Sequence, residues 1–74
     1  MSRLIRMDQT GHTILAEWSA GDRSAFDVAA ATFREQLDLG LFALAPLPGG
    51  GAEQVTELPF DAPTVILRRP IAGG

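Results

Sequence analysis

The stretch that decides the fold of this 74-residue chain is SAFDVAAATFREQLDLG, residues 24–40. Its apolar side chains recur at intervals of four, three and four residues, a spacing that places them on one stripe of an α-helix. The stripe consists of Phe26, Ala30, Phe33 and Leu37. A single helix with one apolar stripe needs a second layer to cover it, and a sheet supplies one. The stretch therefore predicts a two-layer α+β domain.

The predicted helix runs from Ser24 to Leu39. Either Asp22 or Ser24 can cap its first turn, because the side-chain oxygens of these residue types accept hydrogen bonds from the free backbone N–H groups. Gly40 is placed to end the helix in a left-handed conformation, which residues with a β-carbon resist.

Two short strands joined by a turn are expected before the helix. The segments 3–8 and 13–18 are both rich in apolar residues, and the polar stretch between them contains a glycine, which favours a hairpin. In the second strand Ile14, Ala16 and Trp18 alternate with other residues, so we expect them on one apolar face. The pattern leaves open which face of the first strand is buried.

Two or three strands are expected after the helix. Residues 41–45 form a continuous apolar run that is typical of a buried strand, and the proline- and glycine-rich segment 46–51 ends it. Residues 54–60 predict a weaker strand at the edge of the sheet, because Pro59 cannot donate to a ladder. Residues 64–67 are rich in branched side chains, which suit a central strand.

Composition excludes several classes of function. The formal net charge is −3, and all six basic residues are arginines scattered along the chain, so we do not expect nucleic-acid binding. The chain has no cysteine and therefore no disulfide or thiolate site. No apolar run is long enough for a signal peptide or a membrane span, which predicts a soluble, cytoplasmic protein with no membrane contact.

The last ten residues carry the most specific pattern in the chain. They read VILRRPIAGG, residues 65–74. Because Pro70 removes a backbone donor and fixes φ, the strand should end near Arg68 or Arg69. This ending resembles the C-terminus of the β-grasp sulfur carriers of molybdopterin and thiamine synthesis, and the order of hairpin, helix and strands is the β-grasp order.

The resemblance implies an α+β fold of the β-grasp, ubiquitin-like kind. In such a fold a β-hairpin and one amphipathic helix, packed on a four- to five-stranded mixed sheet, would occupy residues 1–69. A flexible tail that ends in Gly-Gly would follow as residues 70–74.

Ubiquitin shares this fold and a diglycine end, but its arginines alternate with leucines and adjoin the glycines. Here Arg68 and Arg69 are adjacent, and three residues separate them from Gly73. The tail is therefore closer to that of the sulfur carriers. The segment from Ala30 to Ala62 also resembles small bacterial ubiquitin-like proteins that are encoded beside E1-like activating enzymes.

The resemblance implies that the working part of the protein is its C-terminal carboxylate. A carboxylate is a poor electrophile, so an E1-like (ThiF-type) enzyme would adenylate Gly74 with ATP before sulfur, a thiol or an amine attacks. Gly73 would allow close approach, because glycine lacks a β-carbon. Contacts with the activating enzyme are expected from the rest of the tail and its base, which comprise Ala72, Ile71, Pro70, Arg69 and Arg68.

Two products of activation stay open at this point, a thiocarboxylate for sulfur delivery and a conjugate through an isopeptide bond. Beyond the activating enzyme, the expected partners are an E2-like enzyme, a JAB-type metalloprotease or a sulfur-transfer protein. The chain has no lysine and cannot build lysine-linked chains on itself, which favours a carrier or single conjugation. No bound cofactor is expected, since ATP is used by the partner enzyme.

The alternative function is a β-grasp interaction module that is never conjugated. It would bind a partner through the face that carries Trp18 or through an exposed strand edge. Trp18 itself is interpreted as a core or rim residue. His12, the single histidine, is interpreted as a solvated turn residue, so neither a metal site nor catalysis is expected and the protein is not expected to be an enzyme.

Overall fold

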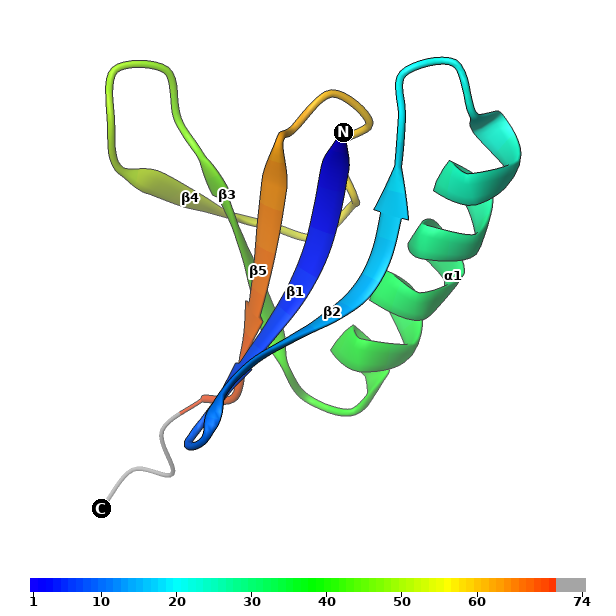
Figure 1. Cartoon of the computed structure of the whole chain (residues 1–74). Coiled ribbons are helices and arrows are strands. Elements are labelled where there is room, and N and C mark those ends of the chain that lie inside the picture. The colour runs from blue at the N-terminus through cyan, green and yellow to red at the C-terminus, as the bar shows by residue number, and fades with distance from the viewer. Residues whose placement is uncertain (71–74) are drawn as a thin grey trace.

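The computed structural model describes residues 1–70. Its elements follow in the order β1 (Ser2–Asp8), β2 (Gly11–Trp18), α1 (Arg23–Asp38), β3 (Phe42–Pro46), β4 (Ala52–Val55) and β5 (Thr64–Arg68). One helix packs on one side of a five-stranded mixed sheet (Figure 1). The predicted α+β class, with one helix and a mixed sheet, is confirmed.

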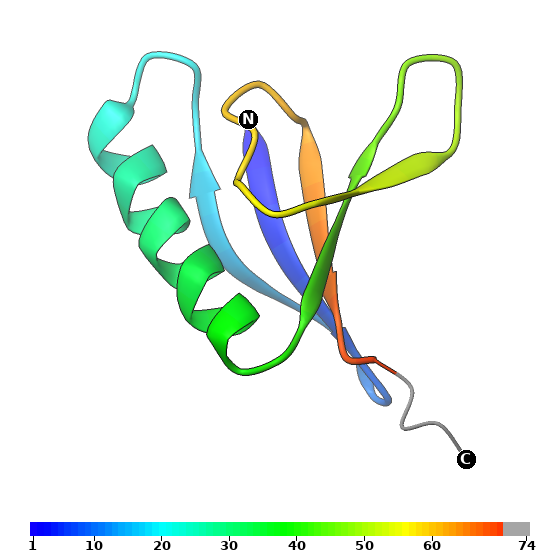
Figure 2. The same ribbon diagram turned by 180° about the vertical axis from the view of Figure 1, so that it is seen from behind.

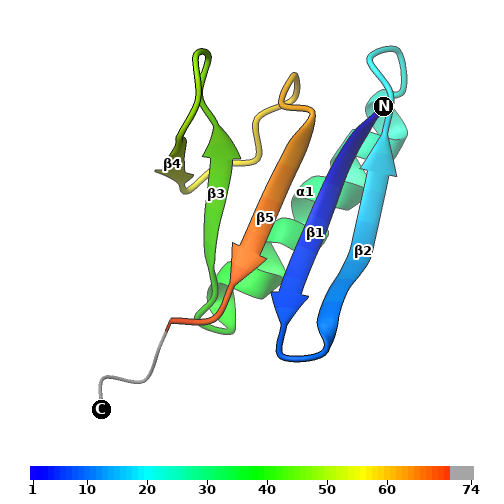
Figure 3. The same ribbon diagram turned by 60° about the vertical axis from the view of Figure 1, so that its left-hand side comes forward.

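The strand order in the sheet is β2-β1-β5-β3-β4. β1 and β5 run parallel in the middle of the sheet, and all other neighbours are antiparallel. The first and last strands therefore lie side by side (Figure 3). A parallel pair cannot be joined by a tight turn, and here β2, the helix and the β3–β4 hairpin lie between the two strands in the chain.

The two ends of α1 are formed as the sequence indicates. The Asp22 carboxylate accepts a hydrogen bond from the backbone N–H of Ala25 at 2.9 Å, so Asp22 rather than Ser24 caps the helix. Gly40 follows the helix with φ of +99°, a conformation that strains residues with a β-carbon.

The core lies between α1 and the side of the sheet that faces it. The largest fully buried side chains are Trp18, Leu4, Leu67 and Val65. The helix contributes the buried residues Ala29 and Phe33. The rest of the predicted stripe is partly buried against this core, and it comprises Phe26, Ala30 and Leu37.

Trp18 is a core residue, which is one of the two placements, core or rim, predicted from the sequence. Only 2% of its surface is exposed, and its indole Nε1–H donates to the backbone oxygen of Phe60 at 2.9 Å. Phe26 packs edge-on against both of these rings, with centroid distances of 5.6 Å to Trp18 and 4.9 Å to Phe60. The suggestion that the Trp18 face binds a partner is therefore wrong, because that side chain is already covered.

The segment after β4 departs from the prediction. The sequence predicts a strand over residues 54–60, whereas β4 ends at Val55 and an irregular connection follows. Pro59 has no N–H to extend a ladder, and Leu58 is buried in the core instead. The connection crosses the sheet on the helix side (Figure 2) and closes the core there. β4 is an edge strand, as predicted.

A register shift in β2 overturns a second prediction. Leu4 pairs with Ala16 and Ile5 pairs with Ile14, which leaves Leu15 as the extra residue of a β-bulge. Ile14 therefore lies on the opposite face of the sheet from Ala16. The prediction of a single apolar face for this strand is therefore wrong. The local sequence does not show the bulge, which only the pairing with β1 reveals.

Candidate activation site at the end of the last strand

β5 carries the candidate site to one end of the sheet. It lies between β1 and β3, and its last residue, Arg68, pairs with Phe42. Leu67 is fully buried, whereas Arg68 and the two residues after it are exposed. The chain thus passes from the core to the surface within one residue, and the prediction that the strand ends near Arg68 or Arg69 is confirmed.

The structure describes three of the predicted site residues. Arg68 occupies the last position of β5, and Arg69 and Pro70 follow it outside any strand. The other four lie outside the described residues: Ile71, Ala72, Gly73 and Gly74. The roles expected of these four therefore stay predictions.

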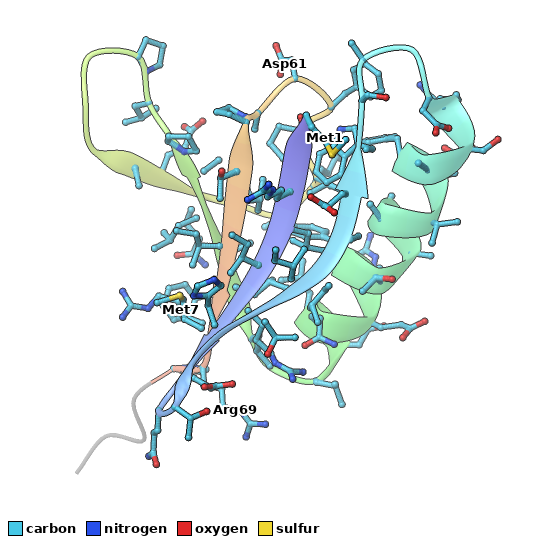
Figure 4. All side chains as sticks on the ribbon, viewed as in Figure 1. Met1, Met7, Asp61 and Arg69 are labelled. Atoms are coloured by element: carbon cyan, nitrogen blue, oxygen red, sulfur yellow. The ribbon has the colours of Figure 1, made fainter. Side chains whose placement is uncertain are left out.

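An open hollow of about 590 Å³ lies beside the two arginines. Its remaining lining residues come from the β1–β2 turn and its approach, and they are Met7, Asp8, Gln9 and Thr10. Figure 4 shows Arg69 at the end of the sheet where the chain leaves. Sequence reasoning missed these turn residues, because only the parallel pairing of the first and last strands brings them to the site.

Hydrogen bonds within the turn hold Asp8 in place. Its Oδ1 accepts from the Thr10 hydroxyl at 2.8 Å and from the Thr10 backbone N–H at 2.9 Å. These two bonds, with a smaller contribution from the positive charge of Arg6, lower the pKa of Asp8. The carboxylate is therefore directed into its own turn.

The two arginines at the base of the tail form a positive patch. Both ion pairs found within residues 1–70 lie elsewhere, one between Arg3 and Glu17 and the other within α1. Exposed guanidinium groups attract carboxylates and phosphates, to which their planar fork of donors is matched. The patch can therefore hold an acidic surface next to the end of the chain.

Within residues 1–70, no three histidine or carboxylate side chains gather to hold a metal ion. His12 stands at an exposed position of β2, opposite Met7. Over the same residues, no helix combines the length and the apolar character needed to cross a bilayer. The described part of the site is thus an exposed strand end that carries two arginines beside an open hollow.

Comparison of the chain with known protein families, with curated proteins and with solved structures finds no match.

Proposed function

We propose that this chain is a β-grasp, ubiquitin-like protein modifier or sulfur carrier whose Gly74 carboxylate is adenylated by an E1-like enzyme. The observation that carries the proposal is the exit of β5. The strand leaves the core after Leu67 and brings the exposed Arg69 and Pro70 to the surface. Five residues from Pro70 onward span up to about 17 Å when extended, enough to reach a nucleotide pocket that the globular body cannot enter.

The architecture is compatible with the β-grasp assignment. A hairpin, one helix and a mixed sheet follow in that order, with the first and last strands parallel at the centre. A central last strand anchors the base of the tail firmly, because it is hydrogen-bonded on both sides. The body can then serve as a rigid handle for its terminal carboxylate.

The proposed chemistry has two steps, both carried out by the partner enzyme. A carboxylate oxygen of Gly74 attacks the α-phosphorus of ATP, and the bond to the departing pyrophosphate breaks. A nucleophile then attacks the acyl-adenylate carbonyl and AMP leaves. Sulfide gives a thiocarboxylate, and an amine gives an amide. The Gly73-Gly74 sequence favours this chemistry because neither residue has a side chain to obstruct a narrow channel.

The arginine patch supplies the second part of the proposal. Arg68 and Arg69 would bind carboxylates on the activating enzyme and hold the tail in line with its pocket. Replacing both with alanine should raise the concentration of this protein that half-saturates the enzyme, while the maximal rate changes little.

The decisive experiment is ATP–pyrophosphate exchange with the E1-like enzyme of the same cell. The full chain should support exchange, and a variant that lacks Gly73-Gly74 should not. Val28→Ser is the matched control, because Val28 is 65% exposed on α1 and remote in sequence from the tail. Exchange that is equally strong with the truncated chain would sink the proposal. Intact mass after the reaction separates a thiocarboxylate from an amide conjugate.

A further inference from the structure

The helix side of the sheet carries a groove that the proposed activation chemistry does not use. It lies between α1 and the irregular connection that follows β4 (Figure 2), and its volume is about 310 Å³. We call it the connection groove. α1 lines it with Phe26, Phe33 and Arg34, and the connection lines it with Thr56, Glu57 and Leu58.

The floor of the connection groove is apolar and is held in place by the core. Phe33 and Leu58 are buried, so each shows only a small part of its side chain to the groove. Phe26 is half-buried and packs edge-on against both Trp18 and Phe60. An apolar side chain that enters the groove therefore loses contact with water without any rearrangement of the core.

The rim of the connection groove carries one charge of each sign. Arg34 belongs to the α1 wall and Glu57 to the wall formed by the connection, and both are exposed. Neither takes part in an ion pair within residues 1–70, because the two pairs found there lie between β1 and β2 and within the first turns of α1. Each charge is therefore open to a group of opposite sign on a ligand.

The backbone of the connection wall can also take part in binding. Within residues 1–70, no backbone–backbone hydrogen bond involves Thr56, Glu57 or Leu58. Peptide groups are strong donors and acceptors, and those of this segment are not used by the sheet. They can pair with the main chain of a peptide laid beside them, which favours a peptide ligand over a purely apolar small molecule.

We propose that the connection groove binds a short segment of another protein in which one phenylalanine stands between an acidic and a basic residue. The phenyl ring enters the groove, where Phe26 and Phe33 offer aromatic partners. The volume of about 310 Å³ lies at the lower end of ligand sites, so it takes one large side chain and not a whole helix face. The flanking side chains have long stems that keep their charges at the wet rim, the acid near Arg34 and the base near Glu57.

The test uses the full chain labelled with ¹⁵N and four short peptides with blocked ends. The first contains glutamate, phenylalanine and lysine in a row, and the second has alanine in place of the phenylalanine. The third has glutamate on both sides of the phenylalanine, and the fourth has lysine on both sides. The first should bind best and shift the amide signals of residues 26–34 and 56–58. The alanine peptide should bind at least about tenfold more weakly, and the other two about two- to fivefold more weakly.

Charge variants of the rim then test the assignment of each wall. Arg34→Glu makes both rim charges negative, so the peptide with two lysines should become the tightest ligand. Glu57→Arg makes both positive, so the peptide with two glutamates should become the tightest. Glu53→Arg is the matched control, because Glu53 is exposed in β4, does not line the groove and changes the net charge equally. Deletion of Gly73-Gly74 should leave binding unchanged, so the proposal stands or falls independently of the activation chemistry.

Three outcomes would refute the proposal. The first is equal binding of the phenylalanine and alanine peptides, or amide shifts centred on the hollow between Met7 and Arg69. The second is an order of preference among the charged peptides that neither rim variant changes. The third is a concentration-dependent dimer in sedimentation that Arg34→Glu dissociates, which would assign the groove to a second copy of this chain. Far-UV circular dichroism of each variant checks that a change in binding does not come from loss of fold.

Discussion

Replacing Trp18 with phenylalanine tests how the core holds the irregular connection between β4 and β5. The substitution keeps an aromatic ring beside Phe26 but removes the indole N–H that donates to the Phe60 backbone oxygen at 2.9 Å. It also leaves part of the indole volume empty inside the core, because only 2% of the Trp18 surface is exposed. Both losses act at the contact between β2, α1 and this connection.

The expected cost is about 2–3 kcal/mol. The lost hydrogen bond contributes about 1 kcal/mol. The missing part of the ring equals roughly two buried methylene groups, or about 1–2 kcal/mol with its cavity. A domain of this length has a total stability of about 4–11 kcal/mol, so the loss is a large fraction of it. The midpoint of thermal unfolding should fall by roughly 10–20 °C.

Thermal and urea unfolding followed by far-UV circular dichroism measure the effect, because the substitution removes the only tryptophan and with it the fluorescence signal. Val28→Ala is the control, since Val28 is 65% exposed and its change should stay within about 0.5 kcal/mol. A Trp18→Phe variant as stable as that control would refute the reasoning, because neither the hydrogen bond nor the ring packing could then matter.

Three further changes test the helix ends and the turn beside the candidate site. Asp22→Ala should lower the free energy of unfolding in urea by about 1 kcal/mol through loss of the helix cap, and Asp22→Asn should retain most of it. Gly40→Ala should lower the free energy of unfolding by about 1–2 kcal/mol because φ is +99°, even though an added β-carbon would meet open space. Gly21 has no positive φ, so Gly21→Ala should be neutral or stabilising in the same assay. The pKa of Asp8 lies below its ordinary value of 3.8 in the folded protein. This carboxylate therefore stabilises the fold above that value and loses its contribution as the pH falls through the folded-state pKa. Thr10→Val removes the largest cause, so the unfolding midpoint should change less between about pH 6 and pH 2 than in the wild type, and an unchanged pH dependence would count against this assignment.

The sequence predicted part of the candidate site. Pro70 and the arginines before it marked the end of the last strand, because proline lacks the donor that a ladder needs. The position of the β1–β2 turn beside these arginines was not predictable, since no local pattern states which strands pair. The outward placement of Ile14 was hidden as well, because the alternation in β2 reads as continuous across the bulge at Leu15.

Local chemistry in the sequence was sufficient for the elements whose cause is local. The apolar stripe centred on Phe33, the capping side chain of Asp22 and the left-handed Gly40 act within a few residues, and each of them behaves as predicted. The tertiary structure alone decided the strand order, the bulge that turns Ile14 outward and the burial of Leu58 in place of a longer β4. Strand pairing joins segments that are far apart in the chain, and a shift of one residue in its register exchanges the two faces of a strand, so facing residues are determined by the partner strand and not by the local sequence.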